Sequence, residues 1–289
     1  KTIKNFNSLS PSKEQLKNLL DHFQNGRFTE AEILAKSITK EFPFHQFAWK
    51  ILGVVFKQTN RINESINFMR KSVKLDPQDA ESHNNLGVVY QELGRLEEAE
   101  ASYIQATILQ TRYTEAYNNL GNVLKDQGKF DKAVNAYEKV ISINPNYSEA
   151  YYNMGLTFKL LGKLEESKTY YTKAIELNPN HSKAYNNLGN VLQKKGNIEE
   201  AIEAYKKALV ISADYVEAYN NLGKALKDQG KIEDAIKSFK KALSINPSYA
   251  YAHNNIGNAL KDQGKLEGSI KSFKKALLIN PDYSEAYNN

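Results

Sequence analysis

The 289-residue sequence contains no cysteine and only one tryptophan, two methionines and seven prolines. Without cysteine, the chain can form no disulfide and no zinc site built on thiolates. This absence is compatible with a reducing compartment, and we expect a cytoplasmic protein. No apolar run approaches the roughly 18 residues that a membrane-spanning helix needs, so we expect no membrane span. The first residue is Lys1 rather than methionine, and we therefore expect the native N-terminus to be missing.

The sequence also lacks the side-chain clusters on which catalysis and metal binding depend. No histidine has a second ligand three or four residues further on in a metal-binding arrangement. The glycines are spaced for helix ends and packing, unlike those of a phosphate-binding loop. We therefore expect no catalytic residue, no metal and no cofactor in this chain, and hence no enzyme activity of its own. The five histidines are His22, His45, His83, His181 and His253.

What the sequence has instead is a repeat of 34 residues, marked by glycine. A second glycine lies seven residues after the first in most copies, and proline recurs near the end of the unit. We number each repeat from 1 to 34, which puts these residues at positions 8, 15 and 32. A period of this length is typical of a stacked solenoid rather than a closed globule. The glycines at position 8 are Gly53, Gly87, Gly121, Gly155, Gly189, Gly223 and Gly257.

This register predicts the organisation of the whole chain. Leu19 replaces the first glycine in the earliest copy, which is therefore degenerate. Thr111 and Ala213 replace proline, and we expect the helices there to run on and the turns to differ slightly. The predicted segments are an N-terminal extension, 1–11; the degenerate repeat, 12–45; the full repeats 46–79, 80–113, 114–147, 148–181, 182–215, 216–249 and 250–283; and the start of a truncated repeat, 284–289.

Each repeat is predicted to form two helices. In the copy 114–147, positions 4, 7, 8 and 11 hold Tyr117, Leu120, Gly121 and Leu124. These residues form the stripe of an amphipathic helix, which we expect to pack in the core. Glycine at position 15 is suited to end that helix, because it adopts a left-handed conformation at little cost. The second helix carries small residues at positions 20 and 27 and an aromatic residue at 24 in most copies.

The spacing of these residues resembles the tetratricopeptide repeat (TPR), and the resemblance covers residues 12–283. It implies an all-α, right-handed TPR solenoid, a superhelix of helix-turn-helix repeats. It also implies partners that are proteins or extended peptides. The chain stops at Asn289, inside a predicted helix. We therefore expect either that more protein follows or that a second copy packs on the open C-terminal end, which makes self-association possible.

Asparagine recurs on the first helix of each repeat, opposite the predicted core stripe. The helical wheel groups positions 2, 5, 6, 9, 12 and 13 on this face, which lines the inside of the superhelix in the TPR family. Asparagine is a mediocre helix former, but its amide can hold both the N–H and the C=O of a peptide group. The candidate peptide-binding residues are Asn85, Asn119, Asn153, Asn187, Asn221 and Asn255 at position 6, and Asn122, Asn190 and Asn258 at position 9.

A second interpretation of these asparagines remains open. They can be polar filler, or they can form hydrogen bonds between repeats and stiffen the solenoid. From helix propensity alone, replacing Asn119, Asn153, Asn187 and Asn221 by alanine should leave stability unchanged or raise it. Binding should fall in the same variant if the amides hold a peptide.

Charge favours polypeptide over nucleic acid as the partner. The formal net charge is +6, but the lysines cluster late in the second helices and the acids early, an order that complements the helix dipole. The expected inner face carries both signs, with glutamates such as Glu115 near lysines such as Lys125. Binding of phosphates favours an uninterrupted basic surface. We therefore expect no nucleic-acid partner.

A closer resemblance concerns the string at 118–129, with near copies at 186–196, 220–231 and 254–265. It is similar to the TPR superhelix of protein O-linked N-acetylglucosamine transferases, and bacterial TPR arrays ahead of other transferase domains look much the same. The resemblance implies the substrate-recognition arm of a larger glycosyltransferase. The alternative is a structural or oligomerisation scaffold that uses its convex face or its chain ends. Apolar residues expected to be exposed for that purpose are Phe42, Phe44 and Phe68.

Overall fold

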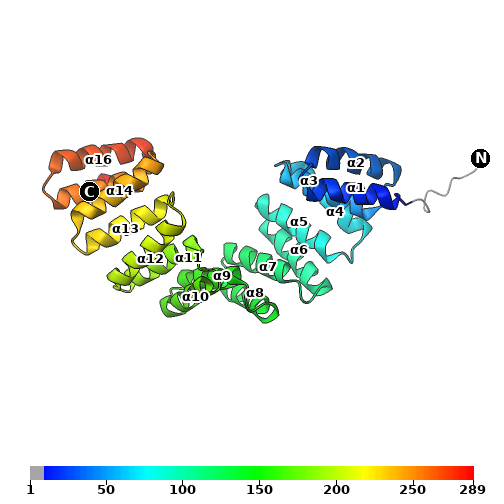
Figure 1. Cartoon of the computed structure of the whole chain (residues 1–289), viewed down its shortest axis with the longest axis horizontal. Helices are drawn as coiled ribbons and strands as arrows, with labels where there is room; N and C mark the ends of the chain where they lie inside the picture. The colour runs from blue at the N-terminus through cyan, green and yellow to red at the C-terminus, as the bar shows by residue number, and fades with distance from the viewer. Residues whose placement is uncertain (1–9) are drawn as a thin grey trace, which may run out of the picture. The chain divides into compact units, whose positions relative to one another are not determined.

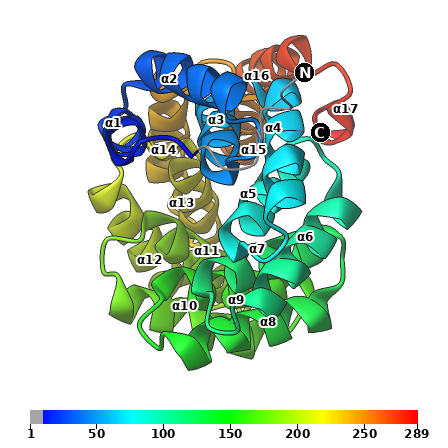
Figure 2. The same ribbon diagram turned by 90° about the vertical axis from the view of Figure 1, so that its right-hand side faces the viewer.

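The computed structural model describes residues 10–289, which form seventeen helices and no strand. Most of the extension predicted for 1–11 lies outside the described residues. The chain divides after Pro145 into two units, and each is described by itself. Within each unit, successive helices stack as antiparallel pairs (Figure 1, and from the side in Figure 2).

The first unit contains α1 (Lys13–Gln24), α2 (Phe28–Glu41), α3 (Gln46–Gln58), α4 (Ile62–Leu75), α5 (Ala80–Glu92), α6 (Leu96–Leu109), α7 (Thr114–Asp126) and α8 (Phe130–Ile143). The second unit contains α9 (Ser148–Leu160), α10 (Leu164–Leu177), α11 (Ser182–Lys194), α12 (Ile198–Ile211), α13 (Val216–Asp228), α14 (Ile232–Ile245), α15 (Ala250–Asp262), α16 (Leu266–Ile279) and α17 (Ser284–Asn288).

The helix ends follow from a few residues. At position 15 the backbone is left-handed, for example at Gly94 with a φ of 71°, and Asn60 takes the same place with a φ of 60°. The second helices end at position 30 whether or not proline follows. Where Thr111 replaces proline, α6 still ends at Leu109, and α12 ends at Ile211 before the Ala213 turn. The expected helix extension is therefore wrong. The residues after both helices have φ values of −132° and −130°, close to the −136° found ahead of a proline turn.

The core of most repeats is a glycine packed against an aromatic ring. A Cβ atom on Gly87 would lie 2.6 Å from the ring of Tyr103, and one on Gly189 would lie 2.6 Å from the ring of Tyr205. Both tyrosines are fully buried. Close approach of the two helices therefore requires glycine at position 8. The ring is tyrosine, or phenylalanine at 239 and 273, and is replaced in the first full repeat by Met69.

The predicted core stripe is partly wrong. Leu120 and Gly121 are buried as expected, but Tyr117 at position 4 is only half-buried. The fully buried residues beside them are Ala116 at position 3 and Val123 at position 10. The buried side of this helix therefore includes positions 3 and 10, which the predicted stripe did not contain, and position 4 lies at its edge.

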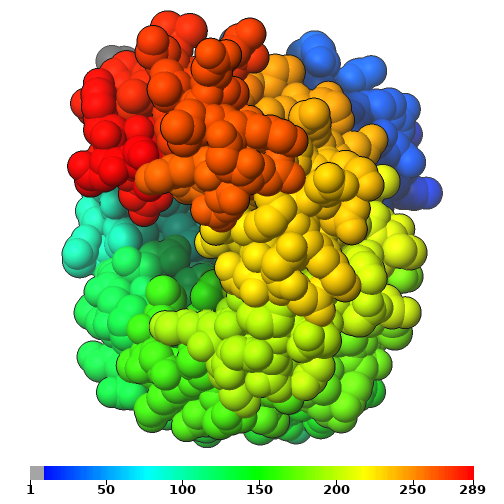
Figure 3. All heavy atoms as spheres, turned by 90° about the vertical axis from the view of Figure 1, so that its left-hand side faces the viewer, coloured from blue at the N-terminus to red at the C-terminus, as the bar shows by residue number. Residues whose placement is uncertain are grey.

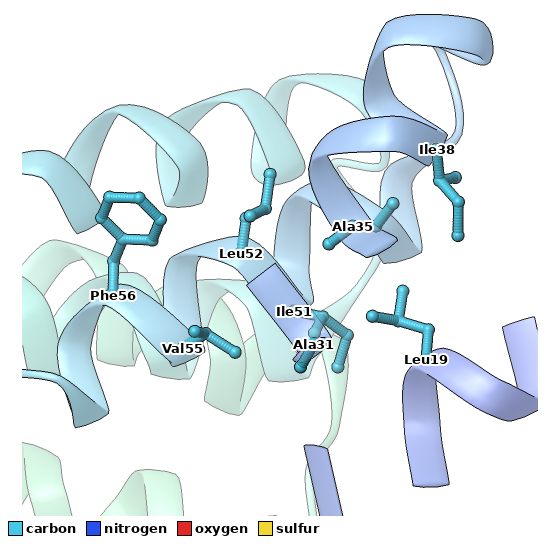
Figure 4. Close-up of a cluster of buried hydrophobic side chains, with 9 residues drawn as sticks. Leu19, Ala31, Ala35, Ile38, Ile51, Leu52, Val55 and Phe56 are labelled. Atoms are coloured by element: carbon cyan, nitrogen blue, oxygen red, sulfur yellow. The ribbon is translucent and has the colours of Figure 1, made fainter. Parts of the chain in front are cut away.

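The degenerate first repeat shares its core with the first helix of the repeat that follows (Figure 4). Leu19 of α1 points toward Ala31 of α2 and Ile51 of α3, and all three side chains are buried. Leucine thus fills the space that glycine and an aromatic ring share in later repeats. Phe42 and Phe68 pack against this cluster and are partly buried, so only Phe44 of the three phenylalanines expected on the surface is well exposed, at 65%.

Candidate functional site

The six asparagines at position 6 all lie on the first helix of their repeat. Asn85, Asn119, Asn187, Asn221 and Asn255 are half-buried, on α5, α7, α11, α13 and α15. Asn153, on α9, is buried at 5% exposure. Repetition of the helix pair thus places one of these amides at the same position of the first helix in each of the six repeats.

Most of these amides form hydrogen bonds between neighbouring repeats. Asn119 Nδ2 donates to Asn84 Oδ1 at 3.1 Å, and Asn221 Nδ2 donates to Asn186 Oδ1 at 3.0 Å. The acceptors, at position 5, are buried at 1% and 5% exposure. One N–H of each such asparagine therefore bonds between repeats, as the second interpretation of the sequence proposes. The same bond joins Asn255 to Asn220 at 2.8 Å and Asn289 to Asn254 at 3.1 Å.

Two asparagines at position 6 differ from this pattern. Asn187 Nδ2 donates to the hydroxyl of Tyr152, which replaces the position-5 asparagine, at 3.1 Å. Asn85 follows a repeat whose position 5 is Lys50, and it forms no hydrogen bond with any residue of 10–289. Asn85 is therefore a position-6 asparagine whose amide does not join neighbouring repeats.

The position-9 asparagines are held by the core tyrosines. The hydroxyl of Tyr137 donates to Asn122 Oδ1 at 2.8 Å, and that of Tyr205 donates to Asn190 Oδ1 at 2.8 Å. Asn258 belongs to a repeat in which phenylalanine replaces this tyrosine, and its side chain forms no hydrogen bond in the described part of the chain. The hydroxyl therefore orients the amide in two repeats and leaves it unrestrained in the third.

The expectation that alanine at position 6 leaves stability unchanged needs revision. Removing the Asn119 or Asn221 side chain deletes the donor to a buried carbonyl oxygen. An unsatisfied buried polar atom costs more free energy than asparagine loses by its helix propensity. The variant with four alanines should therefore be less stable than the parent.

Tyrosines in the inter-repeat turns form a feature that the sequence analysis missed. They occupy position 34, and Tyr215 and Tyr249 line a pocket of 380 Å³ in the second unit together with Lys183 and Glu217. Burial, with the nearby carboxylate of Glu217, raises the pKa of Tyr215 and of Tyr249 to about 12, so both hydroxyls stay protonated and can donate hydrogen bonds. The recurrence of tyrosine at position 34, before most of the first helices, is the signal that could have found them.

Positions 12 and 13 pair across repeat boundaries at the other end of the first helices. Lys57 lies 3.5 Å from Glu92 in the first unit. In the second unit Lys227 lies 3.1 Å from Asp262, and Gln193 donates to Asp228 at 2.6 Å. In each pair the acid occupies position 13 of the later repeat.

The first full repeat carries an ionic cluster where later repeats carry asparagine. Lys50 Nζ lies 2.7 Å from Glu81 and 3.1 Å from Asp79. Ser82 also donates to Asp79, at 2.7 Å. Burial alone would raise the pKa of Asp79, but the Ser82 hydroxyl and the Lys50 ammonium outweigh it and hold the pKa below its usual value. Burial likewise opposes the charge on Lys50, but its two acidic partners outweigh it and raise the pKa of Lys50.

Within residues 10–289, no helix is both long and apolar enough to cross a membrane. The same residues contain no group of three or more histidine, aspartate or glutamate side chains that could hold a metal ion. The sequence-based expectation that the chain has no catalytic centre stays a prediction.

Comparison with known families identifies the repeat. Models described as tetratricopeptide repeat or TPR repeat match eight segments: 48–79, 68–101, 121–162, 148–181, 170–203, 194–230, 223–264 and 250–283. The chain belongs to the tetratricopeptide-repeat family. The expected all-α TPR solenoid is thereby confirmed. No curated protein matches the chain.

Solved structures share the TPR fold. A structure of the APC/C hetero-tetramer Cut9–Hcn1 is 18% identical over 90% of this chain, with a TM-score of 0.67. This chain spans about half (51%) of the length of the matched protein. MamA is 29% identical over 57% of this chain and 97% of its own, with a TM-score of 0.53. YrrB, described as a TPR protein with an unusual peptide-binding site, is 22% identical over 64% of this chain and 96% of its own, with a TM-score of 0.54.

Proposed function

We propose that this chain is a protein–protein interaction module that binds extended polypeptide along the asparagine-bearing face of its first helices. The observation that carries the proposal is the incomplete use of the asparagine amides. Asn221 and Asn255 each donate one side-chain N–H to the preceding repeat. Within the described residues, the second N–H and the carbonyl oxygen of each amide form no hydrogen bond. Such an amide can pair with both groups of a peptide bond and so recognise backbone rather than side chains.

The hydrogen bonds between repeats support binding as well as stability. An amide fixed by one bond loses less side-chain entropy when a ligand takes the others, so a held asparagine binds better than a free one. The solenoid presents these amides at regular intervals within each unit, which suits an extended chain. YrrB, which shares the fold, is described as having a peptide-binding site, in line with this proposal.

The finer form of the proposal is that the module is the substrate-recognition arm of a larger glycosyltransferase. Its support is the string at 118–129 and its copies, which resemble the TPR region of O-linked N-acetylglucosamine transferases. Fusing the chain to a glycosyltransferase catalytic domain tests it: modification of disordered substrates should rise relative to the catalytic domain alone. An equal rate for both proteins would reject this form and leave the binding proposal intact.

Backbone recognition can be tested directly with peptides whose N–H groups are methylated. We expect an extended, flexible peptide to bind in a fluorescence anisotropy assay, and alternate N-methylation to weaken it about tenfold or more, since each methyl group removes a donor. Replacing the peptide's uncharged polar side chains by alanine should change affinity far less. Equal binding of the methylated peptide would rule out an amide grip on the backbone.

Asn85 and Asn258 provide the matching protein variants. Neither side chain forms a hydrogen bond among residues 10–289, so Asn85→Ala with Asn258→Ala removes ligand groups without removing a scaffold bond. Peptide affinity should fall severalfold. The control pair is Asn67→Ala with Asn135→Ala, which removes exposed asparagines from the second helices α4 and α8. A similar loss in the control pair would contradict the proposed face.

The scaffold alternative has an apolar surface of its own on α16. Leu266, Ile270 and Leu278 are exposed at 60%, 53% and 84% in the last full repeat, whose atoms Figure 3 shows in orange and red at the surface of the second unit. Self-association through this end predicts a concentration-dependent mass in analytical ultracentrifugation. The substitution Leu278→Glu should abolish that dependence if α16 forms the contact.

A further inference from the structure

The repeat 148–181 departs from the others on the face where the asparagines lie. Position 9, which is asparagine in three repeats, is Leu156, and position 13, which is acidic in α5, α7, α13 and α15, is Leu160. Leu160 is 55% exposed, and Leu156 is half-buried. Two aliphatic side chains one helical turn apart thus occupy positions that elsewhere hold amides or carboxylates.

The next repeat adds an unbalanced positive charge. Position 13 of α11 is Lys194, and its counterpart at position 12 of α9 is Lys159. The corresponding pairs in the same unit are Gln193 with Asp228 and Lys227 with Asp262. A lysine therefore stands where the acid of the pair belongs, and neither Lys159 nor Lys194 forms an ion pair among residues 10–289.

Lys159 is held in place without a counter-charge. Its ammonium lies 3.5 Å from Asn187 Oδ1, and the amide of Asn190 lies 3.5 Å from the same oxygen. Burial, with the nearby charge of Lys194, lowers the pKa of Lys159. A cation in this setting is stabilised by any carboxylate that enters, because the attraction to the carboxylate offsets both the desolvation and the repulsion.

We propose that Lys159 and Lys194 bind a side-chain carboxylate of the partner, and that Leu156 and Leu160 receive an aliphatic side chain next to it. The partner is then an extended polypeptide with an acidic residue beside a leucine-like one. This inference rests on the proposed function, and it adds a point of side-chain selectivity to a face that otherwise recognises backbone. Charge complementarity selects this occupant, since the face supplies the lysines and lacks the acid that other repeats contain.

Three labelled peptides of equal length, with both ends chemically blocked, test the acidic half. One contains aspartate and glutamate among leucines, the second the corresponding amides, and the third lysines in their place. In anisotropy titrations at low salt, the acidic peptide should bind about tenfold tighter than the amide peptide, and the lysine peptide weakest. Equal affinities for the acidic and amide peptides would overturn the inference.

The variant Lys194→Asp restores the acid that Asp228 and Asp262 provide in their repeats. It should pair with Lys159 and abolish the preference for the acidic peptide, while the amide peptide binds as before. The control Lys240→Asp makes the same change of charge on an exposed site of α14. A loss of preference in Lys240→Asp as large as in Lys194→Asp would mean that net charge, and not this site, selects the peptide.

The variant Leu156→Asn tests the aliphatic half by restoring the residue found at Asn122 and Asn190. It should weaken the leucine-containing acidic peptide severalfold and leave an alanine-containing acidic peptide unaffected. Its control is Val210→Asn, since Val210 is 83% exposed on α12. Equal losses for the leucine and alanine peptides would remove the aliphatic part of the proposal.

Two further outcomes separate the possible failures. If none of the three peptides binds the parent protein, the proposed function fails together with this inference. If the amide and acidic peptides bind equally, only this inference fails. Single-stranded RNA of matched length serves as a competitor: if it binds more tightly than the acidic peptide and loses affinity in Lys194→Asp, the lysines form a phosphate site and the inference is wrong.

Discussion

The residue at position 5 contacts the next repeat in two ways. At one boundary between repeats it forms ion pairs, and at others it accepts a hydrogen bond from a side-chain amide. Where α3 meets α5, Lys50 pairs with Asp79 and Glu81. Where α11 meets α13, Asn186 accepts a hydrogen bond from Asn221. An amide bond carries no net charge and does not titrate. An ion pair acts over a longer range, but salt screens it and acid removes it. One repeat architecture thus contains a boundary that responds to solution conditions and others that do not.

The largest expected effect concerns the core beneath the two kinds of boundary. A Cβ at Gly189 would meet the ring of Tyr205 at 2.6 Å, and one at Gly53 would meet the flexible thioether of Met69 at 2.7 Å. Both side chains are fully buried, but the rigid ring cannot retreat, whereas the flexible methionine can change rotamer. Gly189→Ala should lower the free energy of unfolding by about 2–3 kcal/mol and Gly53→Ala by less than about 1 kcal/mol. Urea denaturation measures both, and equal losses would show that Met69 is as fixed as the ring.

The second largest expected loss of stability concerns the ionic boundary, where Lys50 pairs with Asp79 and Glu81. Lys50→Met leaves the half-buried Asp79 without its cation, and we expect a loss of about 1–3 kcal/mol at neutral pH. Native-state hydrogen exchange should place that loss in α3 and α5. The parent protein should also lose the contribution of Asp79 as the pH falls below about 4. The folded pKa of Asp79 lies below its usual 3.8, so its stabilisation is complete above that value and disappears as the pH falls through the folded pKa.

Glu32 extends the acid sensitivity of the first unit. The hydrogen bond from Arg61 lowers the pKa of Glu32 from 4.5 to about 2, so this pair weakens over the same interval. Lys50→Met should therefore remove part of the acid response and leave the part that Glu32 contributes. An unaltered acid response in the variant would show that the Lys50 cluster does not titrate with folding.

The amide boundary should show a smaller loss that is insensitive to salt and pH. Asn221→Ala removes the donor to Asn186 and should cost about 1 kcal/mol. Asn85→Ala is the matched control, because Asn85 donates to no neighbouring repeat within the described chain, and it should be neutral or slightly stabilising. Thermal unfolding at low and high salt compares the two. A stabilising Asn221→Ala would mean that the bond between repeats contributes nothing.

The smallest expected effect is the loss of one core hydroxyl. Tyr205→Phe deletes hydrogen bonds to Asn190 and Gln193 but keeps the ring, as Phe239 does in the next repeat. We expect a cost of about 0.5–1 kcal/mol, because Asn190 and Gln193 retain access to water. Denaturation midpoints provide the measurement. A loss as large as that of Gly189→Ala would place the hydroxyl, rather than the ring packing, at the centre of core stability.

The helix pairs could be predicted because their determinants are close in sequence. Gly189 and Tyr205 lie in one repeat, and the helix-ending glycine stands between them at Gly196. The bonds between repeats could not be predicted in the same way. Asn119 meets Asn84, 35 residues earlier, although the repeat is 34 residues long. That offset depends on how far one helix slides along the next, which spacing within a single helix does not encode.

The ionic and apolar exceptions were visible in the sequence only as breaks in a pattern. Lys50 marks a repeat without its position-5 asparagine, but its pairing with Asp79 depends on the turn before α5. Leu160 and Lys194 belong to different repeats, and the missing acid becomes evident only when positions 12 and 13 are seen to face each other. Sequence identifies the residues that deviate, and stacking decides which deviations meet.

The register of the amide bonds has a consequence for how such a chain can change its length. Because Asn186 bonds to Asn221 and Asn220 bonds to Asn255, each repeat presents the same donor to one neighbour and the same acceptor to the other. Excision of residues 216–249 would bring Asn255 to the place that Asn221 leaves and restore the bond to Asn186. Duplication of that segment would likewise create a matching bond at each new junction. The gene can therefore gain or lose whole repeats by unequal recombination, and the amide bond still forms at each new junction.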